Sequence, residues 1–379
     1  MNSTTFGDEL CRLRKAARLT QRELAQRLYV VRTTVGRWES GEVTPDSATV
    51  AKLDAALGAN GHLRRVHATA AIPAVTTPQL DAGQPASADY VAGLHASMQR
   101  LVALDGQHGG GELAPLAARL FRSANRLLAA GRYDSTVESD FTAVTAELGE
   151  VAGWLAFDAL QFDQARNHWL EALHLAQLAG DTAMELFCLG NMALVAQEQR
   201  RPAEALRTCT RMTQAYRLSP RLKVMVAMRH ARAAADLGND GAVELIQRAR
   251  VAADDSIAPT DPSWSWWITG SEVAAHEAGI YRARGDWSTA VDRYAAALDT
   301  VPAGYRWFRY IGNANLLDAL VNVEDWGEVE RVGTTVLALS EDIHSARAGR
   351  RIHNAATAAK RRAAPPSVEG LMSALTSAS

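Results

Sequence analysis

The strongest constraint on the fold is a pattern of small and aromatic residues that recurs at helical spacing along most of the chain. Its clearest copy reads AGIYRARGDWSTAVDRYAAAL, residues 278–298. Small residues let two helices approach closely, and the aromatic residues between them fill the remaining space. With position 290 of this copy, four weaker copies give equivalent positions at 165, 205, 242, 290 and 329, in steps of 40, 37, 48 and 39 residues. Because no segment alternates like a strand, the sequence predicts an all-α fold of stacked helix pairs.

Composition excludes several classes of protein. Nearly half of the 379 residues are hydrophobic, which excludes a mostly disordered chain. The three cysteines show no CxxC spacing, so we expect neither a disulfide framework nor a structural zinc site. No apolar run is long enough to span a membrane, and the N-terminus lacks the apolar core of a signal peptide. We therefore expect a cytoplasmic protein without a membrane contact.

Catalytic motifs are missing as well. None of the four lysines follows a glycine, so the chain has no P-loop, and neither GxGxxG nor GxSxG occurs. His276 and Glu277 begin a string like HExxH, but Ile280 stands where the second histidine would be. The sequence predicts a protein that is not an enzyme and that holds no cofactor or metal.

Local composition divides the chain into four segments. Residues 1–66 form one short helix-patterned unit, and residues 67–86 are rich in Ala, Thr and Pro without periodicity, as in a linker. Residues 87–362 carry the repeats, with DGQHGGGE at 105–112 as the clearest internal loop. Residues 363–379 are expected to be a loosely attached tail.

The formal net charge of −2 conceals two opposite parts. Residues 1–67 contain 11 basic and 7 acidic residues, a net charge of +4, which leaves −6 for the remainder. Nucleic acid repels an acidic surface and attracts a basic one, so any contact with DNA should be confined to the N-terminal unit.

The N-terminal unit contains a recognisable pair of helices. Thr20 and Glu23 form a capping box at the start of a helix over 21–28, which places Leu24, Ala25 and Leu28 on one face. A second helix near 32–40 presents Val35 and Trp38 at helical spacing and stops at Gly41. A further helix follows Pro45, over 47–57. The spacing packs two short helices across a tight turn.

This segment resembles the helix-turn-helix of Xre-type, lambda-repressor-like bacterial regulators. The match runs through Thr20-Gln21, Leu24-Ala25, Val35, Trp38-Glu39, Gly41 and Pro45. In that family the second helix of the motif enters the major groove of DNA. The resemblance therefore implies that six residues contact DNA, with Gln21 binding a phosphate at a helix N-terminus: Gln21, Arg22, Arg32, Thr33, Thr34 and Arg37.

Two interpretations stay open for several of these residues. Thr33 and Thr34 either contact base edges or only cap the helix, and Arg37 suits either guanine or phosphate. Arg14 and Glu39 match a family pair that bonds internally, so we assign them a structural role. Arg18, Tyr29 and Val31 depart from the family pattern, which leaves the start of the recognition helix uncertain by about one residue.

The repeated segments resemble tetratricopeptide repeats, in which paired helices stack into a solenoid. Such solenoids expose the first helix of each pair on a concave face that binds peptides or proteins. The resemblance implies that Asn191, Asn315 and His276 occupy a ligand-contacting position. The alternative is that these side chains bond to a neighbouring helix instead of a ligand. The same face should carry Trp154, Phe157, Phe187, Gln197, Glu272 and Arg282.

Two further groups of residues have no place in the repeat pattern. Trp264, Trp266, Trp267 and Trp307 could line a pocket or a dimer interface, or simply pack. The basic residues between 347 and 362 are interpreted as a solvated helix face.

The whole chain is similar to regulators of actinomycetes that join an Xre-type domain to tetratricopeptide-like repeats. The leading hypothesis is a transcriptional regulator that binds a double-stranded DNA operator as a homodimer and senses a peptide or small-molecule effector. The alternative is an adaptor that is tethered to DNA and whose solenoid binds a protein partner without sensing a ligand.

Overall fold

The structure is a computed structural model that describes residues 6–28, 30–43, 45–59, 63, 75, 78, 80, 83–254, 258–301 and 305–378. The chain divides into two units, Met1–Val75 and Thr76–Ser379, called here the head and the body. Most of the expected linker, 67–86, lies outside the described residues, as does Tyr29. Ala86 is fully buried, and its backbone bonds to residues 132 and 134. The expected linker therefore extends too far at its C-terminal end.

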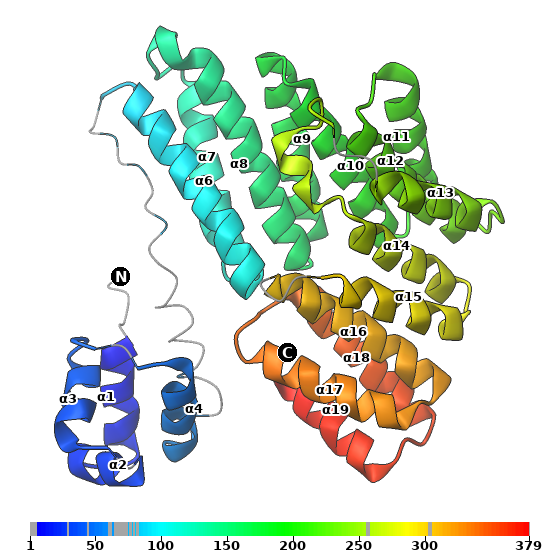
Figure 1. The fold of residues 1–379 in the computed structure, drawn as a ribbon. Helices are drawn as coiled ribbons and strands as arrows, with labels where there is room; N and C mark the ends of the chain where they lie inside the picture. Colours follow the sequence, from blue (N-terminus) through cyan, green and yellow to red (C-terminus); the bar gives the residue numbers. More distant parts are fainter. Residues whose placement is uncertain are drawn as a thin grey trace. The chain divides into compact units, whose positions relative to one another are not determined.

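The described residues of the head include four short helices, which pack around a small apolar core. They are α1 (Phe6–Ala16), α2 (Gln21–Arg27), α3 (Arg32–Glu39) and α4 (Ser47–Ala56) (Figure 1). The predicted capping box is confirmed, since Thr20 Oγ1 accepts from the Glu23 amide at 3.2 Å and Glu23 accepts from the Thr20 amide at 2.7 Å. The core contains the predicted residues Leu24, Ala25, Val35 and Trp38.

The body is a stack of helices, most of them in antiparallel pairs, although α6 packs on α8 and α16 rather than on α7. This confirms the predicted all-α class; the described residues contain no strand beyond one isolated bridge. The first helices of the pairs are α6 (Ala88–His108), α8 (Glu138–Asp158), α10 (Thr182–Glu198), α12 (Pro220–Asp236), α14 (Gly270–Ala283), α16 (Arg306–Val323) and α18 (Ala346–Arg361). The second helices are α7 (Ala114–Ala129), α9 (Phe162–Ala179), α11 (Pro202–Ala215), α13 (Ala242–Asp254), α15 (Trp287–Asp299), α17 (Trp326–Ser340) and α19 (Pro366–Ala378). Short 3-10 helices span Ser135–Val137 and Ser263–Trp267.

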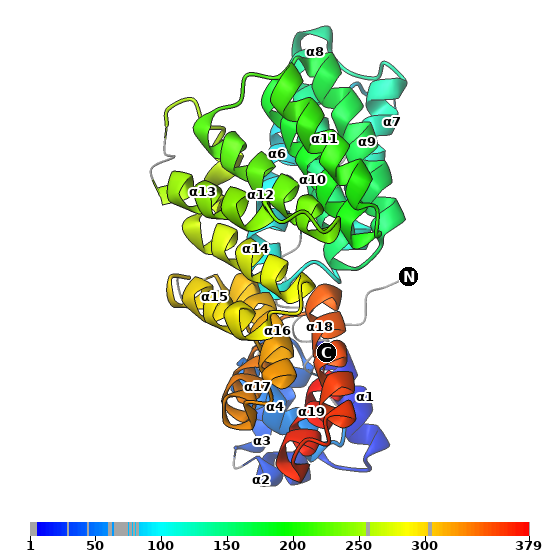
Figure 2. The same ribbon diagram turned by 90° about the vertical axis from the view of Figure 1, so that its right-hand side faces the viewer.

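The recurring small residues lie where the helices of a pair touch. The equivalent positions in all five repeats are at most 1% exposed: Ala165, Ala205, Ala242, Ala290 and Val329. First helices of neighbouring pairs also contact one another, as α8 does with α10, α10 with α12, and α12 with α14 (Figures 1 and 2). The repeat pattern of the sequence therefore marks the packing surface between helices correctly.

The body closes on itself, because its last pairs return to its first. Helix α6 contacts α16, and the His344 amide donates to the His108 carbonyl at 2.7 Å. The side chain of Asp158, fully buried at the end of α8, accepts from Ser345 Oγ at 2.8 Å and from the Gly110 amide at 3.1 Å. Trp307 of α16 donates to the same carboxylate at 3.3 Å. Residues almost 190 positions apart are thus joined at one buried group.

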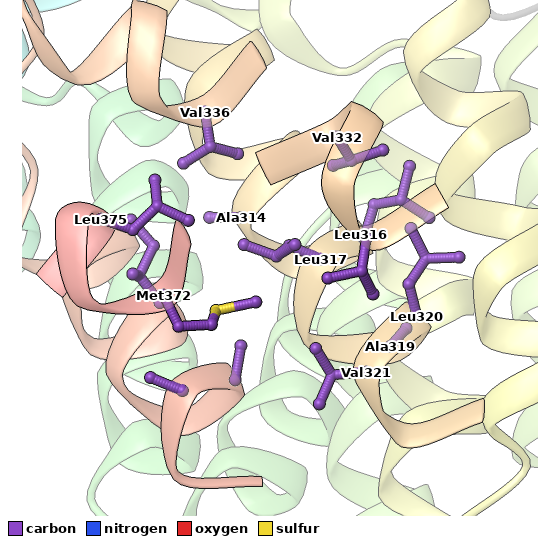
Figure 3. Packing of buried hydrophobic residues seen from close by; sticks show 14 of the residues in the cluster. Ala314, Leu316, Leu317, Ala319, Leu320, Val321, Val332, Val336, Met372 and Leu375 are labelled. Carbon is purple, nitrogen blue, oxygen red and sulfur yellow. The ribbon is translucent and has the colours of Figure 1, made fainter. Parts of the chain in front are cut away.

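The C-terminal residues are not a loosely attached tail, so that expectation is wrong. Helix α19 packs against α17 and α18, and Val368, Met372 and Leu375 are buried. Figure 3 shows Met372 and Leu375 facing Ala314 of α16 and Val336 of α17. Burial of large aliphatic side chains contributes about 1.5–3 kcal/mol each, which is enough to fix one short helix on the last pair.

Replacing Leu375 by alanine tests whether this helix belongs to the core. Leu375 is 0% exposed, so we expect Leu375→Ala to lower the free energy of unfolding of the body by about 2–5 kcal/mol, through lost burial and the cavity that it leaves. Urea denaturation followed by circular dichroism measures the change. Ser373→Ala alters an exposed position of the same helix and serves as the control. Equal stability of the two variants would show that α19 is not part of the core.

Candidate functional site

The second helix of the head motif, α3, begins at Arg32. Its N-cap is Val31, whose backbone is extended (φ −82°, ψ 150°) and whose side chain makes no capping bond. Thr33 and Thr34 therefore lie in the first turn of the helix, and neither is its N-cap. Thr33 is exposed and Thr34 is half-buried. This geometry removes the one-residue uncertainty in the predicted start of the helix.

The exposed surface of α2 and α3 is basic. Arg22, Arg32 and Arg37 are all exposed, and Arg37 Nε donates to Glu42 Oε1 at 2.9 Å. Both partners of this ion pair are more than half exposed, so water screens it strongly and it contributes at most about 1 kcal/mol. A phosphate or a guanine edge can therefore replace Glu42 as the partner of Arg37 with little loss.

Gln21 is engaged within the head. Its Nε2 donates to Glu39 Oε2 at 2.9 Å, which links the start of α2 to the end of α3. Sequence reasoning assigned this side chain to a phosphate contact. In the structure it contributes to the position of α3, and its contact with a phosphate stays a prediction.

Arg14 and Glu39 form the internal pair that the sequence predicts. Arg14 Nε and Nη2 donate to the two carboxylate oxygens of Glu39 at 2.5 and 2.9 Å, and Arg14 Nη1 donates to the Leu19 carbonyl at 2.7 Å. Burial opposes ionisation of Glu39, but the hydrogen bonds from Arg14 and Gln21 outweigh it and hold the pKa of this carboxyl below its ordinary value. One buried carboxylate thus joins helices α1, α2 and α3.

In the body, the predicted ligand contacts separate into buried and partly exposed residues. Asn191 is 1% exposed and donates to Glu150 Oε1 at 2.8 Å, and Gln197 Nε2 donates to the Arg229 carbonyl at 2.7 Å. Asn191 thus bonds to a neighbouring helix, which is the alternative that the sequence left open. Gln197 is buried and bonds in the same way, so its predicted place on an exposed face is wrong. Phe157 is fully buried, so its predicted place on an exposed face is wrong.

Six of the predicted contacts stay partly exposed on first helices: Trp154, Phe187, Glu272, His276, Arg282 and Asn315. Trp154 Nε1 donates to Asp105 Oδ2 at 2.9 Å. His276 Nε2 lies 2.9 Å from Arg229 Nη1 and 3.2 Å from Glu272 Oε1. Burial lowers the pKa of His276, and Arg229 adds to this against the opposing effect of Glu272, so we assign a neutral ring that accepts from Arg229.

The four tryptophans outside the repeat pattern do not form one site. Trp264 stacks on Phe187 with ring centroids 4.0 Å apart, and Trp307 meets the ring of Trp154 at 5.7 Å. Trp267 lies beneath the guanidinium of Arg229. Trp266 is 51% exposed, so it alone of the four offers a large apolar surface to a partner.

Sequence reasoning missed a group of arginines on the first helices. Arg347, Arg350 and Arg351 were assigned to a solvated face of α18, and that interpretation is wrong. Arg347 lies over the ring of Phe157 at 4.6 Å, and Arg350 pairs with Glu198 of α10. Residues 347, 350 and 351 share one face of a helix, which is the signal that identifies them. By contrast, the terminal Arg361 and Arg362 are exposed, as expected.

Comparisons with known proteins bear mainly on the head. Residues 5–66 match a protein family described as a helix-turn-helix domain. Among solved structures, the chain is similar to the crystal structure of Bacillus thuringiensis PlcR in complex with the peptide PapR7 and DNA. The two are 13% identical, and the similarity covers 78% of this chain and 95% of that chain with a TM-score of 0.35. A TM-score this low does not establish a common fold. No curated protein matches the chain.

The described residues lack two other kinds of site. None of their helices combines the length and apolar character needed to cross a bilayer. Nor do they contain a group of three or more His, Cys, Asp or Glu side chains that could hold a metal ion.

Substitution of Arg14 tests the structural role of its pair with Glu39. The side chains are only 10% and 7% exposed, so we expect Arg14→Ala to leave a buried unpaired carboxylate and to destabilise the head by about 3–5 kcal/mol. Arg37→Ala removes only a surface ion pair, and its effect on stability should stay below about 1 kcal/mol. Thermal unfolding of the two full-length variants provides the measurement. Similar stability in both would contradict the assignment.

The buried carboxyl of Glu150 makes the stability of the body depend on pH. Burial raises its pKa to about 8, even though Asn191 donates to it. The folded state therefore favours the protonated carboxyl of Glu150. Its contribution to the stability of the body is complete below pH about 4.5 and is lost as the pH rises through about 8. We expect Glu150→Gln, which preserves an acceptor for Asn191, to flatten the fall of melting temperature between pH 5 and 8. An unchanged slope would refute this origin.

Proposed function

We propose that this chain is a sequence-specific DNA-binding transcriptional regulator. The observation that carries the proposal is the exposed basic surface of α2 and α3 in a segment that matches a helix-turn-helix domain. Arg32, Thr33, Thr34 and Arg37 lie at the start and along the length of α3, the part of a recognition helix that reads base edges. Arg22 supplies a phosphate contact at the adjacent helix.

Charge supports the same assignment. Residues 1–67, which contain the described helices of the head, carry a net charge of +4, whereas the remainder carries −6. Phosphates attract the first and repel the second, so the body stays off the duplex and is available for another role.

For that role we propose dimerisation and ligand sensing. A dimer held by two bodies would present two α3 helices to a near-palindromic operator, one helical turn or a multiple apart. The partly exposed polar residues Glu272, Arg282 and Asn315 on the first helices support a ligand site. A ligand would shift the regulator only if it bound its two arrangements with different affinities.

The DNA-binding role is tested with Arg37→Ala. A duplex is first selected from a random library with the full-length protein, and its affinity is then measured by fluorescence anisotropy at fixed salt. Losing a contact to a base or phosphate costs about 1–3 kcal/mol, so we expect affinity to fall by about fivefold or more. Arg248→Ala removes a 69% exposed arginine from α13 and should bind as the unmodified protein does. Failure to select any sequence, or equal affinity of both variants, would refute the proposal.

A further inference from the structure

Six arginine side chains gather on three first helices of the body. We call them the arginine cluster: Arg229 and Arg232 of α12, Arg282 of α14, and Arg347, Arg350 and Arg351 of α18. They lie close enough to repel one another, since Arg347 and Arg232 act on Arg229, and Arg282 and Arg232 act on Arg351. Like charges at such range are unfavourable unless an anion compensates them.

Carboxylates pair with only part of the cluster. Arg350 pairs with Glu198 of α10, and Arg282 Nη1 lies 3.8 Å from Asp318 Oδ2 of α16. Within the described part of the chain, no carboxylate lies within 4.0 Å of the remaining four: Arg229, Arg232, Arg347 and Arg351. Glu198 also acts at longer range on Arg232, Arg347 and Arg351, and Glu272 acts on Arg229, so a few carboxylates are shared among the six guanidinium groups.

Several buried donors of the cluster lack an acceptor within the described residues. They are the Nε atoms of Arg229, Arg232 and Arg282 and one Nη atom of Arg347. Arg229 is only 3% exposed, and its neighbour His276 likewise has a buried Nδ1 without a partner. Each buried donor without an acceptor costs about 1–3 kcal/mol, so these groups together favour an acceptor that carries negative charge.

Both the charge and the access to the cluster suit a small ligand. Burial lowers the pKa of Arg229 to about 10, and Arg347 and Arg232 add to this against the opposing effect of Glu272, so the group stays charged at neutral pH. The side chains of Arg350 and Glu272 are 31% and 21% exposed, so solvent reaches the edge of the cluster. Guanidinium groups bind carboxylates and phosphates through paired hydrogen bonds, whereas a buried site excludes a bulky polyanion.

We propose that the arginine cluster is the ligand site of the body and that it binds the carboxylate or phosphate group of a small anionic molecule. The inference rests on the proposed function, because it names the chemical class of the sensed ligand. Arg229, Arg232 and Arg347 bind the anion, while Arg282 and Arg350 stay paired with acidic residues.

The test measures the melting temperature of the full-length protein against the concentration of two probes at constant ionic strength. Citrate represents carboxylates, pyrophosphate represents phosphates, and sodium chloride is the reference. A ligand at about ten times its dissociation constant should raise the melting temperature by about 3 °C in a saturating manner. A rise in melting temperature with only one probe shows whether the site prefers a carboxylate or a phosphate. A rise with both probes shows a site that accepts either oxyanion. No rise beyond the chloride reference with either probe overturns the proposal.

Variants locate the site. Arg232→Gln and Arg347→Gln should each weaken the response to the effective probe by about tenfold, whereas Arg248→Ala in α13 should leave it unchanged. Because a buried arginine can also stabilise the fold, isothermal titration of each folded variant supplies an affinity that does not depend on its melting temperature. A response that is equal in all three variants places the anion elsewhere and overturns the assignment.

The same variants separate this inference from the proposed function. Without a probe, Arg232→Gln and Arg347→Gln should bind the selected duplex like the unmodified protein, because the body makes no DNA contact. Loss of anion binding with intact DNA binding would support the site. Intact DNA binding with no anion response in the unmodified protein would reject the site alone.

Discussion

The buried carboxylate of Asp158 is the contact on which the arrangement of the body depends. It receives hydrogen bonds from Gly110, Ser345 and Trp307, which belong to three segments far apart in the sequence. Burial raises the pKa of Asp158, against the opposing effect of Arg347 and these donors. Because the contact joins the first pairs to the last, it also brings Arg350 of α18 within reach of Glu198 of α10. The arginines of α18 reach those of α12 and α14 only in this closed arrangement.

The head depends on a second buried carboxylate of the same kind. Glu39 holds α3 against α1 through Arg14 and against α2 through Gln21. The side chains that face outward from these helices, such as those of Arg32 and Arg37, are exposed and do not hold the helices together. In both units a buried acid fixes the helices, and arginines outside these contacts are exposed or only partly paired.

Local patterns made much of the fold predictable. Helical spacing identifies Leu24, Val35 and Trp38 as core, and the repeated small residues mark the contact within each pair, because both depend only on neighbours along the chain. The spacing of Val368, Met372 and Leu375 carried the same signal, which the interpretation of the tail overlooked.

The site in the body was less predictable, because it depends on how far each pair rotates against the next. That rotation is not encoded in the repeat spacing, so neither the bond from Asn191 to Glu150 nor the inward face of α18 could be derived. Arg347 and Asp158 stand almost 190 residues apart, and only closure of the body brings them together. In the head, by contrast, the pair of Arg14 with Glu39 was predicted from the resemblance to Xre-type regulators, in which the residues at these positions bond to each other.

We propose that two copies of α3, one from each protomer of a dimer, read one DNA site. Hydroxyl-radical footprinting of the selected duplex with the full-length protein tests it most directly. We predict two protected segments whose centres lie about 10 base pairs or a multiple of that apart, which is the spacing of successive major grooves on one face of DNA. A single protected segment at saturation, or no protection at all, would contradict the claim.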